Sequence, residues 1–407
     1  MSTERLYYQD SRLTEFDARV TGVARDAEGR SVVTLDRTAF YPTGGGQPSD
    51  TGLLGAARVV ECVDAEAEGV RHVLEGEAPA VGAEVRGRVD WPRRLDHIQQ
   101  HTGQHILSQA FVELFGAQTR SFRMLAEASE VDVDLKEVSD AAVERAADRA
   151  NEIVWGDRPV RVHQVTPGEA ARMPLRKDSA REGELRVIEI EGFDFSPCGG
   201  THARRTGEVG VIAVRHWERA KALVRVTFVA GGRALADYRR ANRAARAAAA
   251  HFSVGRDEVG EAAARLLEEH KHLQRRSRAL EEVAARAEAR ELLEESEPEA
   301  EADAPPGPRV VARAFEGRDA ESLRRLALAV AARAGVVALL GSRDESGARL
   351  VFARAADAPG DMNALMRRAC QTLEGRGGGR PDLAQGGGPR ADRLPHALDE
   401  AADSLRR

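Results

Sequence analysis

Two pairs of residues that commonly bind metal ions constrain this chain more than any other feature. His101 and His105 lie four residues apart in a segment whose apolar residues recur every three or four positions, which predicts an amphipathic helix over residues 96–116. Residues four apart share one face of a helix, so both imidazoles can reach a single ion. Cys198 and His202 form a second pair with the same spacing. Together the four side chains are a ligand set suited to one zinc ion.

Each pair also has a plainer interpretation when it is taken alone. The two histidines would then be one packed and one solvated residue of a helix, and Cys198 would be a small buried apolar residue. The chain contains 11 histidines and 3 cysteines among 407 residues. Chance would place both pairs in only about two in a hundred sequences of this composition, so the two pairs support each other.

The composition narrows the class of protein. Three cysteines form no disulfide framework and favour a reducing cytoplasm. The chain has no long uncharged apolar run and no apolar signal segment at its N-terminus, so we expect a cytoplasmic protein without a membrane span. A net charge of −6 argues against a general nucleic-acid binder, although it permits a local basic face.

The first predicted domain, residues 1–92, is a small β-barrel. Short β-branched segments are separated by turn signals, and such spacing is typical of a barrel. We expect its strands at residues 16–24, 31–35, 59–63, 71–74 and 85–89.

A glycine-rich stretch, Phe40 to Gly52, interrupts these strands. Gly44, Gly45 and Gly46 can bring backbone N–H groups close to a carbonyl or anionic oxygen of a ligand. The plainer alternative is a long hairpin loop. No Lys-Ser/Thr pair follows the glycines, so this is not a nucleotide-binding Walker loop.

The second predicted domain, residues 93–233, contains the metal pairs and has α+β character. After the helix at 96–116 we expect a helix opened by Ser139 and a short helix near 169–173. The expected strands are 129–135, 160–165, 185–190, 209–215 and 222–229.

The rest of the chain divides into three predicted parts. Residues 234–297, rich in Ala, Arg, Glu and Leu, predict two helices with a break near 253–255, as a helical hairpin or as a solvated spacer. Residues 298–307 form an acidic, proline-rich linker. Residues 308–407 alternate strands and helices as an α/β domain. Its glycine-rich segment at 375–388 contains Leu383 and an Arg-Pro-Asp sequence, which argues against a floppy linker.

Three separated motifs resemble a known family. FYPTGGGQPSDTG, HTGQH and CGGTH are similar to the editing domain of alanyl-tRNA synthetases and of the free-standing AlaX-type editing proteins. GRGGGRPDLAQGGG resembles the C-Ala (DHHA1) domain that ends alanyl-tRNA synthetases. The order of the motifs matches the long AlaX form: barrel, editing domain, helical connector and C-Ala domain. No aminoacylation module precedes residue 1, so we expect an editor without ligase activity.

The resemblance implies a zinc-dependent hydrolase that cuts the ester of mischarged tRNA(Ala). It carries the zinc ligands onto His101, His105, Cys198 and His202. Ser-tRNA(Ala) is the chief expected substrate, with Gly-tRNA(Ala) as a second one. The synthetase motif has Thr immediately before its second histidine, whereas this chain has Gln104 there. The preference between serine and glycine therefore stays open.

The remaining site residues are predicted from this chemistry. We expect Thr102, Gln104 and Gln47 to read the substrate hydroxyl, because a site built around a hydroxyl rejects an analogue that lacks it. The glycine loop, through Gly44, Gly45, Gly46 and Asp50, would hold the substrate. Contacts with tRNA phosphates are expected from Arg376, Arg380 and Arg390, with the neighbouring glycines permitting close approach.

Three questions stay open at the level of sequence. A zinc ion with four protein ligands is usually structural, whereas a catalytic zinc keeps one position free, and the sequence does not decide between them. A non-catalytic RNA-binding protein with a structural zinc is the alternative function. The helical connector or the C-terminal domain could also form a homodimer.

Overall fold

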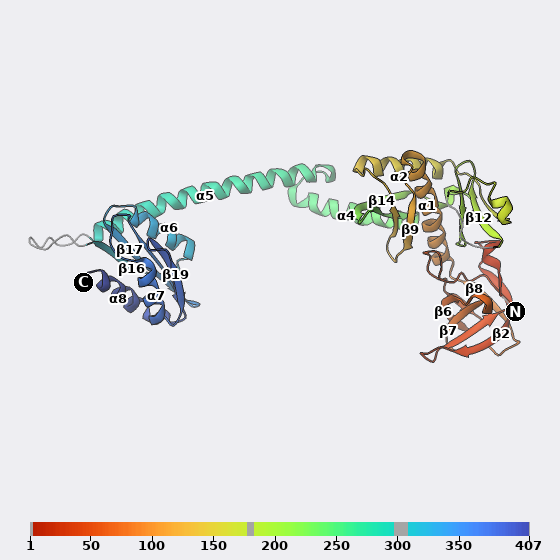
Figure 1. The fold of residues 1–407 in the computed structure, drawn as a ribbon, viewed down its shortest axis with the longest axis horizontal. Coiled ribbons are helices and arrows are strands. Elements are labelled where there is room, and N and C mark those ends of the chain that lie inside the picture. Colours follow the sequence, from red (N-terminus) through yellow and green to blue (C-terminus); the bar gives the residue numbers. More distant parts are fainter. Residues whose placement is uncertain (1–2, 177–182, 297–307, 407) are drawn as a thin grey trace, which may run out of the picture. The chain divides into compact units, whose positions relative to one another are not determined.

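The computed structural model describes residues 3–176, 183–296 and 308–406 of a chain that forms two compact units, Met1–His251 and Phe252–Arg407 (Figure 1). The predicted linker at 298–307 lies outside the described residues. Within the described ranges, every helix is too short or too polar to cross a membrane.

The first unit begins with the predicted barrel, which is confirmed as a closed barrel of six strands. Alternate residues of its first strand, such as Phe16, Ala18 and Val20, point into the apolar interior, so the strand has the period of two expected for a half-buried strand. The strands follow one another around the barrel as β2 (Glu15–Arg25), β3 (Ser31–Leu35), β7 (Val70–Glu75), β6 (Ala57–Asp64), β5 (Gly52–Leu54) and β8 (Glu84–Val89). Two short strands, β1 (Glu4–Arg5) and β4 (Arg37–Thr38), pair beside it.

The helix that carries the histidine pair, α1 (Trp91–Phe115), begins five residues before the predicted start at 96. Pro92 lies in its first turn, where proline is tolerated. The helix ends as predicted at Gly116, which takes the left-handed conformation with φ 64°. Ile98, Ile106 and Phe111 are buried, because α1 runs through the interior and not along a surface.

The domain around α1 is built from two sheets and a second helix. The antiparallel sheet consists of β14 (Ile212–Ala220), β15 (Leu223–Ala230), β10 (Ser129–Val133) and β9 (Thr119–Met124). α1 and α2 (Asp140–Trp155), whose N-cap is the predicted Ser139, share an apolar core with this sheet. The second sheet contains β11 (Val160–Val165), β12 (Leu185–Ile190) and β13 (Asp194–Pro197), with the short helix α3 (Pro167–Ala170) beside it. β9 and β13 are absent from the sequence prediction.

The predicted helical connector is divided between the two units. α4 (Gly232–Phe252) belongs to the first unit and α5 (Val259–Glu295) to the second, and the break at 253–255 is confirmed. The pairing of these helices as a hairpin stays a prediction.

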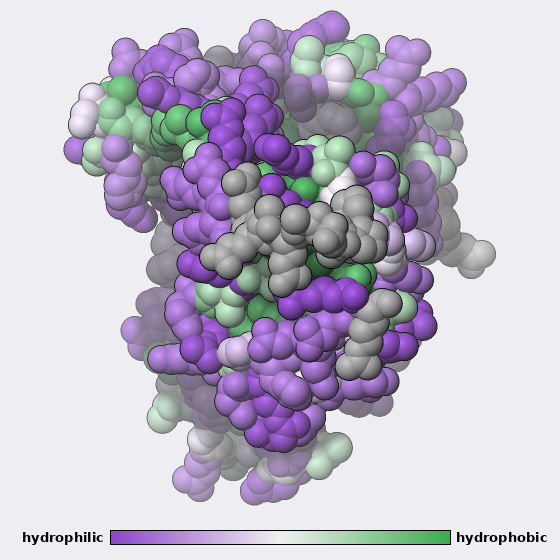
Figure 2. Space-filling view, turned by 90° about the vertical axis from the view of Figure 1, so that its left-hand side faces the viewer, coloured by the Kyte–Doolittle hydropathy of each residue, from purple (hydrophilic) through white to green (hydrophobic). Residues whose placement is uncertain are grey.

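The second unit has a five-stranded sheet covered by helices on both faces. The strand order is β16 (Arg309–Glu316), β17 (Val336–Asp344), β18 (Gly347–Arg354), β20 (Leu383–Gly388) and β19 (Arg376–Gly379), and only the pair β16–β17 is parallel. One apolar core contains α6 (Ala320–Ala331) and the end of α5, and the other contains α7 (Met362–Thr372) and α8 (Leu394–Arg406). Hydrophilic residues cover most of the face shown in Figure 2.

The glycine-rich segment of this unit forms the two strands β19 and β20. A Cβ atom added to Gly386 would lie 2.4 Å from the Sγ of Cys370 on α7, and one added to Gly377 would lie 2.7 Å from it. These glycines therefore let α7 pack against the hairpin. The predicted close approach of the neighbouring glycines to phosphates stays a prediction.

Candidate metal centre and its cavity

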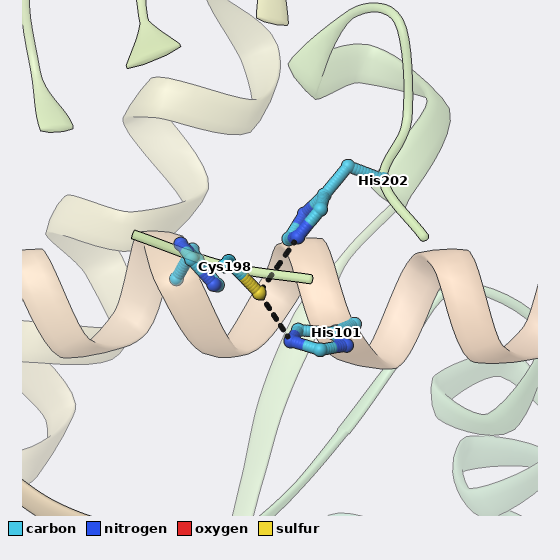
Figure 3. A group of neighbouring side chains, drawn as sticks. His101, Cys198 and His202 are labelled. Carbon is cyan, nitrogen blue, oxygen red and sulfur yellow. Dashed lines mark hydrogen bonds between the residues drawn. The ribbon is translucent and has the colours of Figure 1, made fainter. Parts of the chain in front are cut away.

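The structure brings together all four predicted metal ligands. His101 and His105 project from adjacent turns of α1, and Cys198 and His202 come from the loop after β13. The Sγ of Cys198 lies 3.3 Å from the Nε2 of His101 and 3.3 Å from the Nε2 of His202 (Figure 3). One ligand atom from each of the four residues lies within 4.8 Å of the others. Such a cluster can bind one ion.

Glycine and arginine shape the loop that carries Cys198. A Cβ atom added to Gly200 would lie 2.2 Å from the His101 ring, so only glycine allows the loop to pass this close. The backbone N–H of Gly200 points to the sulfur of Cys198 at 3.4 Å. Arg186 on β12 donates from Nη1 to the carbonyl oxygens of Cys198 (2.7 Å) and Gly200 (3.0 Å). The loop thus turns its carbonyls to Arg186 and an N–H group to the sulfur.

Gln47 from the glycine-rich loop of the barrel orients His101. Its Oε1 lies 2.8 Å from the His101 Nδ1 and also accepts a hydrogen bond from the backbone N–H of Thr201. Because the Thr201 N–H identifies this amide atom as the oxygen, the His101 Nδ1 must carry the proton. The Nε2 lone pair of His101 is then free for a metal ion.

The other two histidines also have side-chain oxygens beside their Nδ1 atoms. Thr102 Oγ1 lies 3.3 Å from the Nδ1 of His202 and accepts from the backbone N–H of Ala203 at 3.0 Å. Asp194 Oδ2 lies 3.4 Å from the Nδ1 of His105, without the alignment of a hydrogen bond. Side-chain oxygens from three different parts of the chain thus lie beside the Nδ1 atoms of the three imidazoles.

The electrostatics of the cluster suit a divalent ion. Burial alone would raise the pKa of the Cys198 thiol, but its interactions with the neighbouring imidazoles, first with that of His101, outweigh burial and lower the pKa well below its ordinary value. Burial lowers the pKa of His202 to about 3, whereas at His105 the interactions with Asp194 and Cys198 outweigh burial and raise the pKa. A thiolate and neutral imidazoles are the forms that bind zinc. The donor set therefore fits the predicted zinc ion.

A cavity of about 610 Å³ opens onto His101, His105 and Cys198. Gln104 also lines it, and its Nε2 donates to Ser108 Oγ at 2.7 Å. Other residues of its wall come from the N-terminal segment, the glycine-rich loop, β9, the segment after α3, and β12: Tyr8, Gly45, Thr119, Arg176 and Arg186. The cavity thus joins the metal cluster to polar and charged side chains.

Two of the residues predicted to read the substrate, Gln47 and Thr102, lie behind the cluster. Both side chains are buried and neither lines the cavity. Their polar atoms are occupied, since Gln47 also donates from Nε2 to Thr201 Oγ1 at 2.9 Å. The structure therefore assigns both to the support of metal ligands, which corrects the expected contact with substrate.

The predicted substrate-binding residues of the glycine loop also separate. Gly45 lines the cavity, whereas Gly44 pairs with Gln47 and the carbonyl of Gly46 accepts from Met124 on β9. Asp50 is fully buried and bound to Arg94 of α1, away from the cavity. Asp50 is therefore a structural residue, and its predicted contact with substrate is corrected.

Sequence reasoning missed Asp194, Arg176, Ser108 and Arg186. Asp194 and Arg176 form a nearly buried ion pair of 2.9 Å beside His105. Asp194 could have been recognised in the sequence as a lone carboxylate in the apolar stretch Phe193–Pro197, four residues before Cys198. No sequence pattern identifies the other three residues.

The arginines predicted to contact tRNA differ in their surroundings. Arg380 pairs with Asp382 at 3.2 Å, and Arg390 pairs with Asp392 at 3.0 Å and with Glu374 at 3.1 Å. Arg376 is exposed on β19 and forms no ion pair within the described residues.

Three family models match parts of the chain. Residues 3–93 match tRNA synthetases class II (A), residues 185–227 match the threonyl and alanyl tRNA synthetase second additional domain, and residues 307–407 match the DHHA1 domain. The second match contains Cys198 and His202, and the third covers the five-stranded sheet and its helices.

Curated proteins that are similar to the chain include an editing protein and a ligase. The alanyl-tRNA editing protein AlaX-L of Pyrococcus horikoshii is 38% identical over 242 residues, which are 57% of this chain and 59% of that protein. The alanine–tRNA ligase of Natronomonas pharaonis is 36% identical over 417 residues, which are 99% of this chain and 44% of the ligase. A solved C-Ala domain of Aquifex aeolicus alanyl-tRNA synthetase is 30% identical, with a TM-score of 0.23, over 24% of this chain and 91% of that one. The chain thus spans about half the length of the curated relatives it matches.

Proposed function

The chain belongs to the family that joins alanyl-tRNA synthetases with the AlaX-type alanyl-tRNA editing proteins, and we propose on this premise that it hydrolyses mischarged tRNA(Ala). Its chief substrate would be Ser-tRNA(Ala), with Gly-tRNA(Ala) as a second substrate. The bond cut is the ester between the amino acid and the terminal ribose. The observation that carries the proposal is the buried His₃Cys cluster opening onto a cavity that also contains Gln104.

His101, His105, Cys198 and His202 would hold one zinc ion. When bound, zinc would supply positive charge that polarises the ester carbonyl or acidifies water. The protein's own contribution is to fix these ligands. Gln47, Thr102 and Asp194 hold the imidazole rings in place, which keeps the three Nε2 atoms directed inward.

Gln104 would read the amino-acid side chain. Its Nε2 is bound to Ser108, whereas its Oε1 has no hydrogen-bond partner among the described residues. A serine hydroxyl can donate to this oxygen, and neither alanine nor glycine has a side-chain group that can do so. Alanine lacks the hydroxyl and would leave the oxygen unpaired, and such an unpaired buried group is how a site rejects the smaller substrate.

The direct test follows ester loss from Ser-tRNA(Ala) and Ala-tRNA(Ala), with and without a chelator. We expect the seryl ester to be cleaved, the alanyl ester to be spared, and the chelator to stop cleavage. Cys198→Ala should abolish both zinc binding and cleavage, whereas Cys62→Ala removes a buried thiol of the barrel and should preserve both. Binding of tRNA without ester loss from either substrate would instead favour an RNA-binding protein with a structural zinc.

Binding of tRNA by the second unit would depend mainly on Arg376, because neighbouring carboxylates compensate the charges of Arg380 and Arg390. Arg376→Gln should weaken tRNA binding and reduce its salt dependence by about one ion. Arg390→Gln is the matched control and should change both less. Equal effects of the two variants would contradict this assignment.

Homodimer formation through α5 is consistent with its exposed apolar residues. Leu266, Leu273 and Leu280 recur every seven residues and are 53%, 60% and 60% exposed in the single chain. Light scattering of the full chain and of a variant with these leucines replaced by glutamine would test it. A monomer at micromolar concentration would exclude this interface.

A further inference from the structure

One arginine in the wall of the cavity is held rigidly and still has an unused hydrogen-bond donor. Arg176 donates from Nε and Nη2 to the carboxylate of Asp194, at 2.9 and 3.3 Å. Its side chain is 9% exposed and that of Asp194 is 1% exposed. Within the described part of the chain, Nη1 of Arg176 has no hydrogen-bond partner, and the residue lines the cavity. The guanidinium is thus preorganised to bind an oxygen of a ligand.

A second cation in the same wall lacks a carboxylate. Arg186 is 9% exposed, and its hydrogen bonds run to the backbone carbonyls of Tyr8, Cys198 and Gly200. Its Nη2 is buried without a partner, and no carboxylate of the described residues lies within ion-pair distance. By contrast, Arg120 at the same cavity pairs with Asp134. Arg186 thus adds positive charge to this wall without a carboxylate partner, which favours binding of an anion there.

The position of Arg176 distinguishes between two anionic groups that an aminoacyl-tRNA presents. Asp194 lies between Arg176 and His105, so a carboxylate and an imidazole ring separate the guanidinium from the metal-binding nitrogens. An oxygen of the reacting carbonyl would lie beside the metal cluster, on the other side of Asp194 and His105 from the Arg176 guanidinium. The phosphate that joins the terminal adenosine to the rest of the tRNA is separated from the ester by the ribose, which matches the larger distance.

We propose that Arg176, supported by Arg186, forms a subsite for the terminal phosphodiester of the substrate, that is, for the 5′-phosphate of the terminal adenosine. The proposal rests on the proposed function for the identity of the substrate, although the anion-binding site itself is open to an independent test. In this arrangement Asp194 positions both partners, because one carboxylate contacts His105 and Arg176. Binding of the phosphate would place the ester over the metal cluster.

The first experiment measures binding to the zinc-loaded full chain by calorimetry, with adenosine 5′-monophosphate and adenosine as probes. A charge-assisted hydrogen bond should make the monophosphate bind about ten- to a hundredfold more tightly. Asp194→Asn keeps Arg176 and should keep this preference. Arg176→Gln combined with Asp194→Asn removes the ion pair without leaving a buried carboxylate, and it should abolish the preference. Equal zinc content in the two variants shows that the metal site survives.

The matched control is Arg161→Gln. Arg161 lies on the neighbouring strand β11, is half exposed and pairs with Glu191 outside the cavity. Its loss removes an equal charge from the sheet that carries Arg186 and should leave the preference for the monophosphate unchanged. An equal loss of preference in Arg161→Gln and in the double variant would overturn the subsite, because the effect would then be one of general charge.

The second experiment compares hydrolysis of seryl-adenosine with that of its 5′-phosphate. The wild type and Asp194→Asn should both favour the phosphorylated ester through KM. The double variant should lose this advantage while keeping the kcat that Asp194→Asn shows on seryl-adenosine. A wild type that cleaves both esters equally would overturn the subsite and leave the proposed function intact. A protein that cleaves neither ester but keeps an Arg176-dependent preference for the monophosphate would overturn the function and retain the subsite. A fall of kcat on both esters in the double variant alone would place Arg176 at the reacting carbonyl, against this proposal.

Discussion

Replacement of Asp50 by asparagine should unfold the first unit at a markedly lower temperature. Asp50 and Arg94 are both fully buried and form a close ion pair. Asp50 also accepts from the backbone N–H of Tyr41 at 2.6 Å, and Arg94 donates to the carbonyls of Ser11 (2.7 Å) and Ala39 (2.6 Å). Asparagine has nearly the same shape but leaves the buried guanidinium without a counter-ion. Breaking such a pair from one side costs about 3–5 kcal/mol.

Thermal unfolding of the first unit can be followed by tryptophan fluorescence, because this unit contains all three tryptophans of the chain, Trp91, Trp155 and Trp217. Their fluorescence therefore reports its unfolding alone. For a unit of this size, 1 kcal/mol shifts the midpoint by about 2–4 °C, so Asp50→Asn should lower it by about 6–20 °C.

The double variant supplies the control. Adding Arg94→Met to Asp50→Asn removes the unpaired buried guanidinium and should recover part of the lost stability. Replacing both partners of a buried ion pair by uncharged residues often changes stability little. If Asp50 were a substrate-binding residue, its replacement would raise KM and leave the midpoint unchanged. That result would refute the structural role assigned here.

Three further outcomes follow from buried contacts. Gln47→Ala and Thr102→Val should each lower the affinity for zinc about ten- to a hundredfold in chelator competition, because each removes an oxygen beside a ligand imidazole. Gln47→Glu keeps the acceptor oxygen and should restore the affinity. Variants that bind zinc as tightly as the wild type would contradict this supporting role. Burial lowers the pKa of His72 to about 4. Between about pH 6.5 and 4, His72 therefore binds a proton in the unfolded chain but stays neutral in the folded barrel. The free energy of unfolding falls by about 3 kcal/mol as the pH drops through this range. His72→Gln removes this dependence, and the stability gap between variant and wild type, measured by urea unfolding, should narrow by that amount on acidification. Gly386→Ala should destabilise the second unit by about 1–3 kcal/mol in hydrogen exchange, with Cys370→Ala restoring part of the loss; normal protection would argue against the tight packing of α7.

The fold was predictable from sequence where local pattern and tertiary environment agree. β3, β11 and β12 have the predicted bounds or nearly so, because alternating β-branched residues and flanking turns identify half-buried strands. β19 and β20 were missed because glycine has a low intrinsic preference for strands. Their place is determined by Cys370 of α7, whose sulfur leaves no space for side chains at Gly377 and Gly386.

The metal ligands could be predicted from the sequence, whereas the residues that support them could not. Spacing on a helix and the CGGTH sequence identify His101, His105, Cys198 and His202 without any knowledge of the fold. Gln47 and Asp194 act through contacts across 54 and 89 positions of sequence, which no local pattern reveals. Polar residues in a glycine loop resemble ligand-binding residues as long as the direction of their side chains is unknown, so Gln47 and Asp50 were assigned to the substrate.

The contacts of Gln47 join the barrel to the chemistry of the neighbouring domain. The glycine-rich loop places an amide oxygen on His101, and the barrel's N-terminal segment supplies Ser11, whose Oγ accepts from the backbone N–H of His202 at 3.1 Å. Two of the four ligands thus depend on residues that precede α1. Because α1 is anchored to the barrel through Arg94 and Asp50, any displacement of the barrel would move the helix and these supports together. The barrel is therefore part of the metal centre, and a domain cut before α1 would keep all four ligands but lose Gln47 and Ser11, which support His101 and His202.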